Sequence, residues 1–465
     1  MLVDSHAPRD LFALVPEGLL GFEPELEVLD RLLEDDRLFQ TVRADLVQRY
    51  PRTATRGRPS TPVEVILRML VVKRLYGWSY AEAEKFVSDS LILRQFCRVY
   101  LERVPDDTTL LRWAGCIGPN TLERLNARAV ELAQQHRVTR GRRLRIDSVV
   151  VETNVGHPTD SRLLGDGVRV LSRLLRQAKR VLGEGAALPK EVFRSRTRSV
   201  RRLAQQIHRI ARRRGAEAAE ELGSLYEKLI AVTEATRRQV QRVSAVLHEE
   251  ASHAATRLRE QFEHLVPLVE QAITQARRRV LQGEVVPAKE KLLSLFEPHT
   301  QLHVRQKPGK VVEFGRKLLL DETEGGIVTR YQVLPEPGTE HPYFEASLTG
   351  HQKHFGRAPD LLAADRGLSS IRNEELARQA GVKRVALPRS GRVSDERRQL
   401  ERSAWWRRAY RFRAGIEGRI SVLRRKYGLE RCLYRGEAGM GRWIGWGILA
   451  HNLTKISQTV AARAA

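Results

Sequence analysis

The chain has 465 residues and a strong excess of positive charge, with 81 Lys and Arg against 56 Asp and Glu for a formal net charge of +25. This excess favours a polyanionic partner such as nucleic acid, because it attracts anions over long range. No apolar run approaches the length that spans a bilayer, and the N-terminus lacks the basic start and apolar core of a secretory signal. The cysteines, Cys97, Cys116 and Cys432, are widely separated, as expected for reduced side chains. We therefore expect a cytoplasmic, nucleoid-associated protein without a membrane span.

The first part of the chain, residues 1–136, reads as a series of helices. Two capping boxes begin at Thr61 and Ser79, and they open VEVILRMLVVKRLYG and YAEAEKFVSD. Gly77 is placed to end the first of these helices. Together with a third helix in DSLILRQFCRVY, they match a helix-turn-helix, although an ordinary helical bundle fits equally well.

Two further helices are predicted before residue 137. Asp107 is a candidate N-cap before TTLLRWAGCIG, and Asn120 opens TLERLNARAVELAQQH. We expect residues 1–136 to form an all-helical DNA-binding domain. Its residues 59–116 would carry most of the recognition of specific DNA.

The middle of the chain changes pattern twice. RVTRGRRLR, residues 137–145, is either a linker that follows a phosphate backbone or a solvated connector to the strand that contains Asp147. Residues 160–296 then carry helical periodicity with alternating Glu and Arg and few glycines, as in exposed long helices. We interpret them as a helical insertion.

From Leu302 the hydrophobic period becomes two, which indicates strands. We expect two strands around a Gly325-Gly326 turn, a short buried strand that ends at Asp365, a helix, a strand in VKRVALP, and a basic helix that contains Glu417. This order predicts an α/β layered domain interrupted by the helical insertion.

The acidic residues Asp147, Asp365 and Glu417 are the strongest functional signal. A carboxylate at the end of each of two hydrophobic strands, with a third from a helix, supplies oxygen ligands for divalent metal ions. Tyr410, Arg413, Glu417 and Arg424 lie three, four and seven positions apart, which places them on one helical face. The alternative for this helix is a simple stabilising pair between Arg413 and Glu417.

The segment YRFRAGIEGRISVLRRKYGL resembles the Y-x2-R-x3-E-x6-K signature of bacterial insertion-sequence transposases of the DDE type. Tyr410, Arg413 and Glu417 match it, whereas Arg424 stands at the lysine position and Lys426 follows two residues later. RIDSVVVETN, HPTDSRLLGDGVRVLSRLL, VEFGRKL and AADRG look like the ISNCY-like group of these enzymes. RPSTPVEVILRMLVVKRLYGWSYAEAEK and VPDDTTLLRWA are similar to the helical domain that precedes their catalytic core, so the resemblance extends from about Pro59 onward.

The resemblance implies an RNase H-like catalytic core, formed by residues 137–159 and 297–465, with residues 160–296 inserted. Asp147, Asp365 and Glu417 would be its catalytic triad and would bind two Mg²⁺ ions, for which Mn²⁺ can substitute. The implied activity is cleavage at the terminal inverted repeats of an element and strand transfer into target DNA.

The same resemblance implies the partners. Double-stranded DNA would be held beside the scissile bond by Tyr410, Arg413, Arg424 and Lys426. An element moves as a unit only when its two ends are brought together, so a homodimer or a larger assembly is expected on DNA.

Two other functions remain open at this stage. A non-catalytic DNA-binding protein would bind specific sequences without using the acidic triad. A stand-alone metal-dependent nuclease of the same fold would cut DNA but never join strands. Trp405 and Trp406 could stack on an unpaired base, although packing of the last helices onto the sheet explains them as well.

Overall fold

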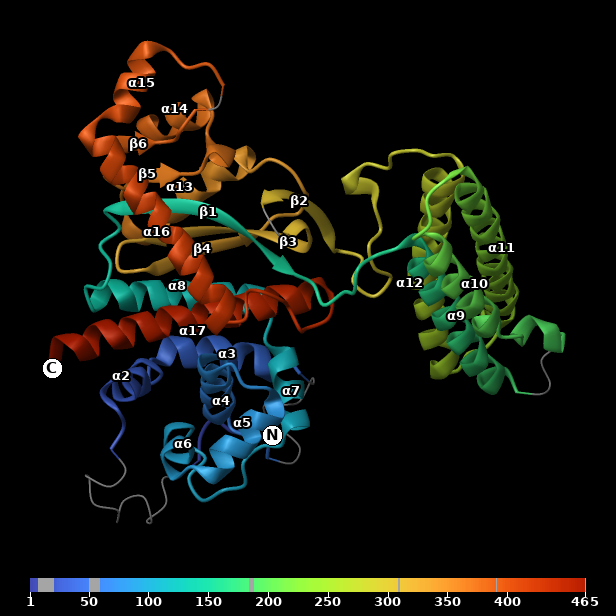
Figure 1. Ribbon diagram of the computed structural model, residues 1–465. Coiled ribbons are helices and arrows are strands. Elements are labelled where there is room, and N and C mark those ends of the chain that lie inside the picture. Colours follow the sequence, from blue (N-terminus) through green and yellow to red (C-terminus); the bar gives the residue numbers. More distant parts are fainter. Residues whose placement is uncertain (7–20, 50–58, 184–187, 308–309, 390, 465) are drawn as a thin grey trace. The chain divides into compact units, whose positions relative to one another are not determined.

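The computed structural model describes residues 1–6, 21–49, 59–183, 188–307, 310–389 and 391–464. The chain forms two compact units, which are coloured along the sequence in Figure 1: residues 1–152 with 317–465, and residues 153–316. Most of the segment considered for a secretory signal, residues 7–20, lies outside the described part of the chain. None of the helices in the described ranges is both long enough and apolar enough to cross a membrane.

The N-terminal part of the first unit is helical, as predicted. Ser79 and Glu82 form the predicted capping box, since the Ser79 side chain accepts a hydrogen bond from the Glu82 backbone and the Glu82 side chain accepts one from Ser79. Gly77 ends the preceding helix with φ of 72°, a left-handed conformation that favours glycine. The helices are α2 (Pro24–Leu32), α3 (Asp36–Val47), α4 (Val63–Tyr76), α5 (Tyr80–Asp89), α6 (Leu91–Phe96), α7 (Asp107–Cys116) and α8 (Pro119–Gln135).

Three predicted helix starts were wrong by a residue or two. Helix α4 follows Pro62, whose ring offers no acceptor, so the capping box predicted at Thr61 is not formed. Asp106 caps α7 in place of Asp107, because its carboxylate accepts the backbone N–H of Thr109 at 2.7 Å. Helix α8 begins with Pro119 at its first position and not with Asn120, since proline is already fixed at a helical φ.

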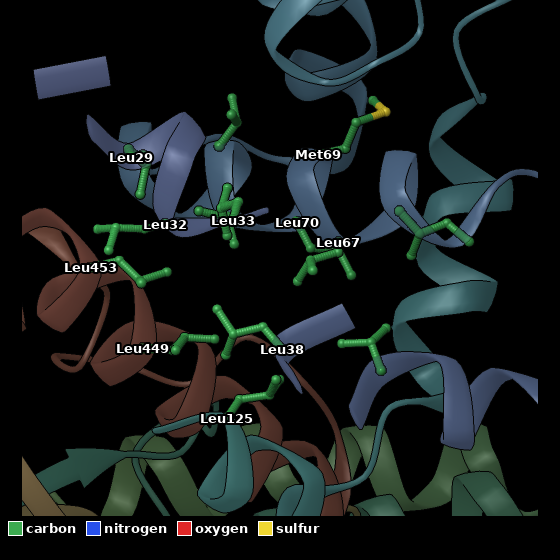
Figure 2. Close-up of a cluster of buried hydrophobic side chains, with 14 of the residues drawn as sticks. Leu29, Leu32, Leu33, Leu38, Leu67, Met69, Leu70, Leu125, Leu449 and Leu453 are labelled. Carbon is green, nitrogen blue, oxygen red and sulfur yellow. The ribbon is translucent and has the colours of Figure 1, made fainter. Parts of the chain in front are cut away.

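The N-terminal helices share one hydrophobic core with the C-terminal helix α17 (Gly436–Ala464). Figure 2 shows leucines of α2, α3 and α4 gathered with Leu125 of α8 and with Leu449 and Leu453 of α17. In Figure 1, α8 and α17 run side by side beneath the sheet. The two ends of the first unit therefore depend on each other for the burial of their apolar side chains.

The sheet of the first unit has the strand order β4-β3-β1-β5-β6. Strands β1, β5 and β6 are parallel, and β3 and β4 form an antiparallel hairpin. Gly325 and Gly326 make the predicted turn of this hairpin, with φ of 83° and 78°. The strands are β1 (Arg143–Glu152), β2 (Gln301–Lys307), β3 (Lys310–Thr323), β4 (Ile327–Val333), β5 (Leu361–Ala364) and β6 (Arg384–Ala386).

The prediction of two strands between the insertion and the short strand before Asp365 was wrong, because β2, β3 and β4 lie there. The additional strand, β2, pairs with the first half of β3 inside the second unit. The second half of β3 pairs with β4 in the first unit. The hydrophobic period of two is the same in both halves of β3, so the sequence pattern does not reveal that β3 belongs to both units.

Helices cover both faces of the parallel part of the sheet. Leu144 and Ile146 of β1 point to one face and pack with α13 (Phe344–Phe355) and α14 (Ile371–Gln379). Alternation along the strand turns Arg145 and Asp147 to the other face, against which α16 (Ala404–Lys426) packs. In Figure 1, α16 crosses the strands obliquely. A short helix, α15 (Asp395–Arg402), precedes it.

The second unit is a helical bundle with its own apolar core, which contains leucines and valines from every long helix. Thr159 caps its first helix, so Asp160 is the first helical residue and pairs with Arg279 at 2.8 Å. The helices are α9 (Asp160–Leu182), α10 (Thr197–Ile210), α11 (Ala216–Leu247) and α12 (His253–Ala276).

We expect His451 of α17 to make the first unit sensitive to acid. Its ring is buried with Nε2 3.0 Å from the Gly326 carbonyl oxygen, and burial lowers its pKa to about 3. The unfolded chain binds a proton near pH 6.5, whereas the folded chain does not until about pH 3. The stability due to the neutral ring is therefore lost progressively as the pH falls through this range.

The test compares urea unfolding of the natural protein and of His451→Gln between pH 7 and pH 4. All six tryptophans lie in the first unit, so their fluorescence follows this unit alone. The free energy of unfolding should fall more steeply with acid in the natural protein. Burial raises the pKa of Asp321 to about 6, which gives the opposite slope, but Asp321 is present in both proteins. Equal slopes would contradict the assignment to His451.

Candidate active site

The two aspartates lie at the same level of neighbouring parallel strands. Ile146 of β1 is in register with Ala364 of β5, and Asp147 and Asp365 follow these residues directly. Asp365 follows the last residue of β5, as predicted, whereas Asp147 lies within β1, because the strand continues through the valines that follow it. The prediction that Asp147 ends its strand was therefore wrong. Each carboxylate accepts a hydrogen bond from the backbone N–H of the next residue, at 2.8 Å for Asp147 and 2.6 Å for Asp365. The pairing of the strands therefore determines how the two aspartates are placed relative to each other.

Helix α16 brings Arg413 and Glu417 to these aspartates. Nη2 of Arg413 lies 3.1 Å from Oδ2 of Asp147 and 3.3 Å from Oδ2 of Asp365, and its Nη1 lies 3.0 Å from Oε1 of Glu417. One guanidinium thus contacts all three carboxylates proposed from the sequence. The simple pair between Arg413 and Glu417 is present as well, but it is one part of this larger cluster.

Burial differs sharply within the cluster. The side chains of Asp147 and Arg413 are 11% and 9% exposed, whereas those of Asp365 and Glu417 are 45% and 67% exposed. Burial raises the pKa of Asp147 to about 6, although the charge of Arg413 opposes this shift. Burial alone would lower the pKa of Arg413, but the neighbouring carboxylates raise it, so the guanidinium keeps its charge. The cluster therefore has a buried side and a side open to solvent.

A buried ion-pair cluster fixes α16 against the sheet beside the acidic site. Both oxygens of Glu322, on β3, accept hydrogen bonds from Arg145, and Oε1 also accepts one from Nε of Arg419 at 3.2 Å. Arg145 also donates to the Phe412 carbonyl oxygen of α16 at 2.6 Å. A Cβ atom on Gly415 would lie only 2.4 Å from Nη1 of Arg145, so the absence of a side chain there allows this approach.

The donor chemistry of the site fits a hard divalent cation. Mg²⁺ prefers oxygen ligands, and carboxylates on two strands and a helix provide them. With Arg413 among the carboxylates, no three His, Cys, Asp or Glu side chains in the described ranges are arranged around a common metal position. The guanidinium of Arg413 offsets part of the negative charge of these carboxylates.

The other residues expected to bind DNA lie in different places. Tyr410 is exposed and lines a cavity of about 740 Å³ together with Arg366, which directly follows Asp365. Arg424 pairs with Glu430 at 3.6 Å, and the ammonium group of Lys426 lies 5.8 Å from the ring centroid of Tyr427. Arg413 is thus part of the acidic cluster and Tyr410 lies beside it, whereas Arg424 and Lys426 contact Glu430 and Tyr427 near the end of α16.

One acidic residue beside the cluster was missed by sequence reasoning. Glu340, in the loop between β4 and α13, accepts a hydrogen bond from Ser148 at 2.6 Å and pairs with Lys317 at 3.1 Å. It is one of the charges that raise the pKa of Asp147. A glutamate in a loop with Pro and Gly carries no periodic signal, so only the folded chain reveals its position.

Two family models match separate parts of the chain. A family model described as "Transposase domain (DUF772)" matches residues 10–115, and one described as "Transposase DDE domain" matches residues 376–457. The chain belongs to the DDE transposases of insertion sequences. It is therefore an enzyme of the transposase and nuclease type, and DNA transposition is its function.

The two matches lie near opposite ends of the sequence of this transposase. The first covers the N-terminal helices through most of α7, and the second contains β6, α15, α16 with Glu417, and most of α17. The chain is also 29% identical over 164 residues to a Rhizobium meliloti protein named "Uncharacterized protein ORF8 in nfe locus". The aligned region covers 34% of this chain and 74% of that protein. No solved structure matches the chain.

Proposed function

We propose that this transposase binds the terminal inverted repeats of its element, cleaves the DNA there, and joins the freed ends to target DNA. The observation that carries the proposal is the gathering of Asp147, Asp365 and Glu417 around Arg413. These residues come from distant parts of the chain, and nothing in the packing of α16 alone requires three carboxylates at one place.

We propose an RNase H-like fold for the catalytic core, composed of residues 137–159 and 297–465. The mixed sheet with helices on both faces supports it. Residues 160–296 would be the helical insertion, and residues 1–136 the domain that recognises the element ends. The ISNCY-like group is our assignment within the family.

The chemistry follows from the needs of phosphodiester exchange. Two Mg²⁺ ions, or Mn²⁺ in their place, held by the three carboxylates would activate the attacking oxygen and stabilise charge on the leaving oxygen. Asp147, on the buried side, would define the depth of the site. Asp365 and Glu417 would hold its open side, where the DNA strand enters.

Arg413 has a specific part in this proposal. Its positive charge offsets part of the negative charge of the three carboxylates and so weakens their mutual repulsion in a partly buried environment. With divalent cations held by the carboxylates, the guanidinium of Arg413 would be available to bind a phosphate oxygen beside the scissile bond. Tyr410 and Arg366 lie on the same side and would contact the same strand.

Removal of divalent metal is expected to abolish cleavage of DNA and to leave the binding of DNA unchanged. Purified protein with duplexes of its own element ends should produce a free 3′-hydroxyl in Mg²⁺ or Mn²⁺ and no product in EDTA, because carboxylates alone cannot stabilise the charge of the transition state. Strand-resolved gels measure the cut and joined products.

The same assay separates the alternatives. Cutting without any joined product indicates a stand-alone nuclease. Specific binding without cutting in either metal indicates a non-catalytic DNA-binding protein. Cleavage that persists unchanged in EDTA would contradict the metal mechanism.

A further inference from the structure

A second basic concavity lies in the first unit, away from the acidic cluster. It is a cavity of about 780 Å³ between the starts of the parallel strands and the N-terminal half of α16, and we refer to it as the linker cavity. The segment of residues 137–145 supplies Arg137, Arg140, Arg142 and Arg143 to its wall. Lys383 and Arg384 at the start of β6, together with Arg408 of α16, complete the set of seven cationic side chains.

The two carboxylates in the wall do not neutralise these cations. Glu324 accepts hydrogen bonds from the backbone N–H groups of Arg140, Arg142 and Arg143, at 2.9 to 3.0 Å. Burial alone would raise the pKa of Glu324, but these backbone donors lower it. Asp360, the second carboxylate, pairs with Lys383 at 2.9 Å. The arginine side chains thus retain a large positive excess.

Aromatic rings position two of the arginines without cancelling their charge. The guanidinium of Arg143 lies 5.0 Å from the ring centroid of Phe412, and that of Arg384 lies 5.9 Å from the ring centroid of Trp405. A ring face attracts a cation but leaves its N–H groups available for oxygen acceptors. The arrangement suits the capture of an anion.

The basic segment is also fixed in position. Gly141 has φ of 63°, and a Cβ atom there would lie 2.3 Å from the ring of Phe355. Its carbonyl oxygen is 3.0 Å from Nε2 of His351. With the hydrogen bonds to Glu324, these contacts hold the backbone of the segment against the unit, so it is not a loose solvated connector.

The linker cavity is separate from the acidic cluster. Arg143, Leu361 and Arg384 are in register at the starts of their strands, four residues before Asp147. At about 3.3 Å per residue, this places them roughly 13 Å from the level of the aspartates. On α16 the cavity is lined by positions 405, 408, 409 and 412, which form one helical face, whereas 410, 413 and 417 form another. Arg408 also lines the cavity of Tyr410, so it lies between the two sites.

We propose that the linker cavity is a second binding site for the phosphodiester backbone of DNA, distinct from the site that holds the strand to be cut. It rests on the proposed function only in that the ligand is DNA. Its chemistry is that of guanidinium groups, which bind phosphate oxygens in a bidentate manner. The bound backbone belongs either to the element end, beyond the cut position, or to target DNA.

The test measures DNA binding in EDTA, where no cleavage is needed. A variant with Arg140, Arg142 and Arg384 all changed to Gln is compared with a control of equal charge, in which Arg31, Arg169 and Arg213 are changed to Gln. Each control arginine already pairs with a carboxylate, namely Glu27, Asp166 or Glu221. All six side chains are exposed, and thermal unfolding checks that both variants are folded.

The cavity variant should bind DNA more weakly than the control. The slope of log affinity against log salt concentration should also be smaller in magnitude by roughly two to three, since each lost phosphate contact reduces this slope by about 0.9. A loss seen only with element-end duplexes assigns the bound backbone to the end. A loss seen also with duplexes of unrelated sequence assigns the site to DNA of any sequence, as target DNA is.

Equal affinities and equal salt slopes for the cavity variant and the control would overturn the inference. This outcome leaves the proposed function standing if the natural protein cuts and joins DNA. Conversely, cavity-dependent binding by a protein that never cuts DNA supports the inference and removes the proposed function.

Discussion

Replacement of Asp365 by Asn is expected to lower the rate of end cleavage by about a thousandfold or more, with binding of duplex DNA in EDTA unchanged. The substitution keeps the shape of the side chain but removes the charge that a divalent cation requires. Loss of about 4 kcal/mol of transition-state stabilisation corresponds to roughly this factor. Asp365 is the best first target because its side chain is 45% exposed, so its replacement should not unfold the chain.

Asp147→Asn and Glu417→Gln should have the same effect on cleavage. Asp395→Asn is a matched control, since Asp395 is 94% exposed and pairs only with Arg398 at 3.3 Å among the recorded ion pairs of the described residues. Rates are measured on element-end duplexes under single-turnover conditions. Cleavage by Asp365→Asn within tenfold of the natural rate would remove Asp365 from the proposed triad.

The second large effect concerns the buried cluster of Arg145, Glu322 and Arg419. Glu322→Ala should destabilise the first unit by about 3–5 kcal/mol, because it leaves two buried guanidinium groups without their shared carboxylate. The Glu322 side chain is fully buried, and those of Arg145 and Arg419 are 11% and 17% exposed. Urea unfolding followed by tryptophan fluorescence measures this loss.

A pair of glycines on α16 tests the same cluster without removing a charge. Gly415→Ala should displace Nη1 of Arg145 from the Phe412 carbonyl oxygen, and the lost hydrogen bond should cost about 1 kcal/mol, which offsets the gain in helix propensity. Gly418→Ala is the control, because nothing lies within 4 Å of a Cβ atom there, and alanine should stabilise the helix by up to about 1 kcal/mol. Identical effects of the two substitutions would show that Arg145 does not depend on the space at Gly415.

Much of the local structure follows from the sequence, because it is encoded by neighbouring residues. The Ser79 capping box, the Gly77 helix end and the Gly325-Gly326 turn each depend on interactions within a few positions. The errors at α7 and α8 are shifts by one or two residues: Asp106 and Asp107 are both suitable caps for α7, and α8 is capped by Gly118 in place of Asn120. Helical spacing also predicted that Arg413 and Glu417 share a face.

The contacts that were not predicted are those between distant segments. Nothing in the spacing of α16 indicates that Arg413 contacts two aspartates from β1 and β5 as well as Glu417. The partners of Glu322, on β1 and α16, are likewise set by how the strands are ordered in the sheet. In the sequence, Glu322 reads only as the end of a strand before a turn.

The insertion of the second unit between β1 and β3 has a consequence for synthesis. Asp147 and Arg413 are 266 positions apart in the chain, yet they are in contact. At a ribosomal rate of about 5–20 residues per second, β1 waits on the order of tens of seconds for its partners β5 and α16. The inserted bundle, whose contacts are more local, can fold during this interval. The acidic cluster is therefore completed only when almost the whole chain has emerged, and truncated chains lack it.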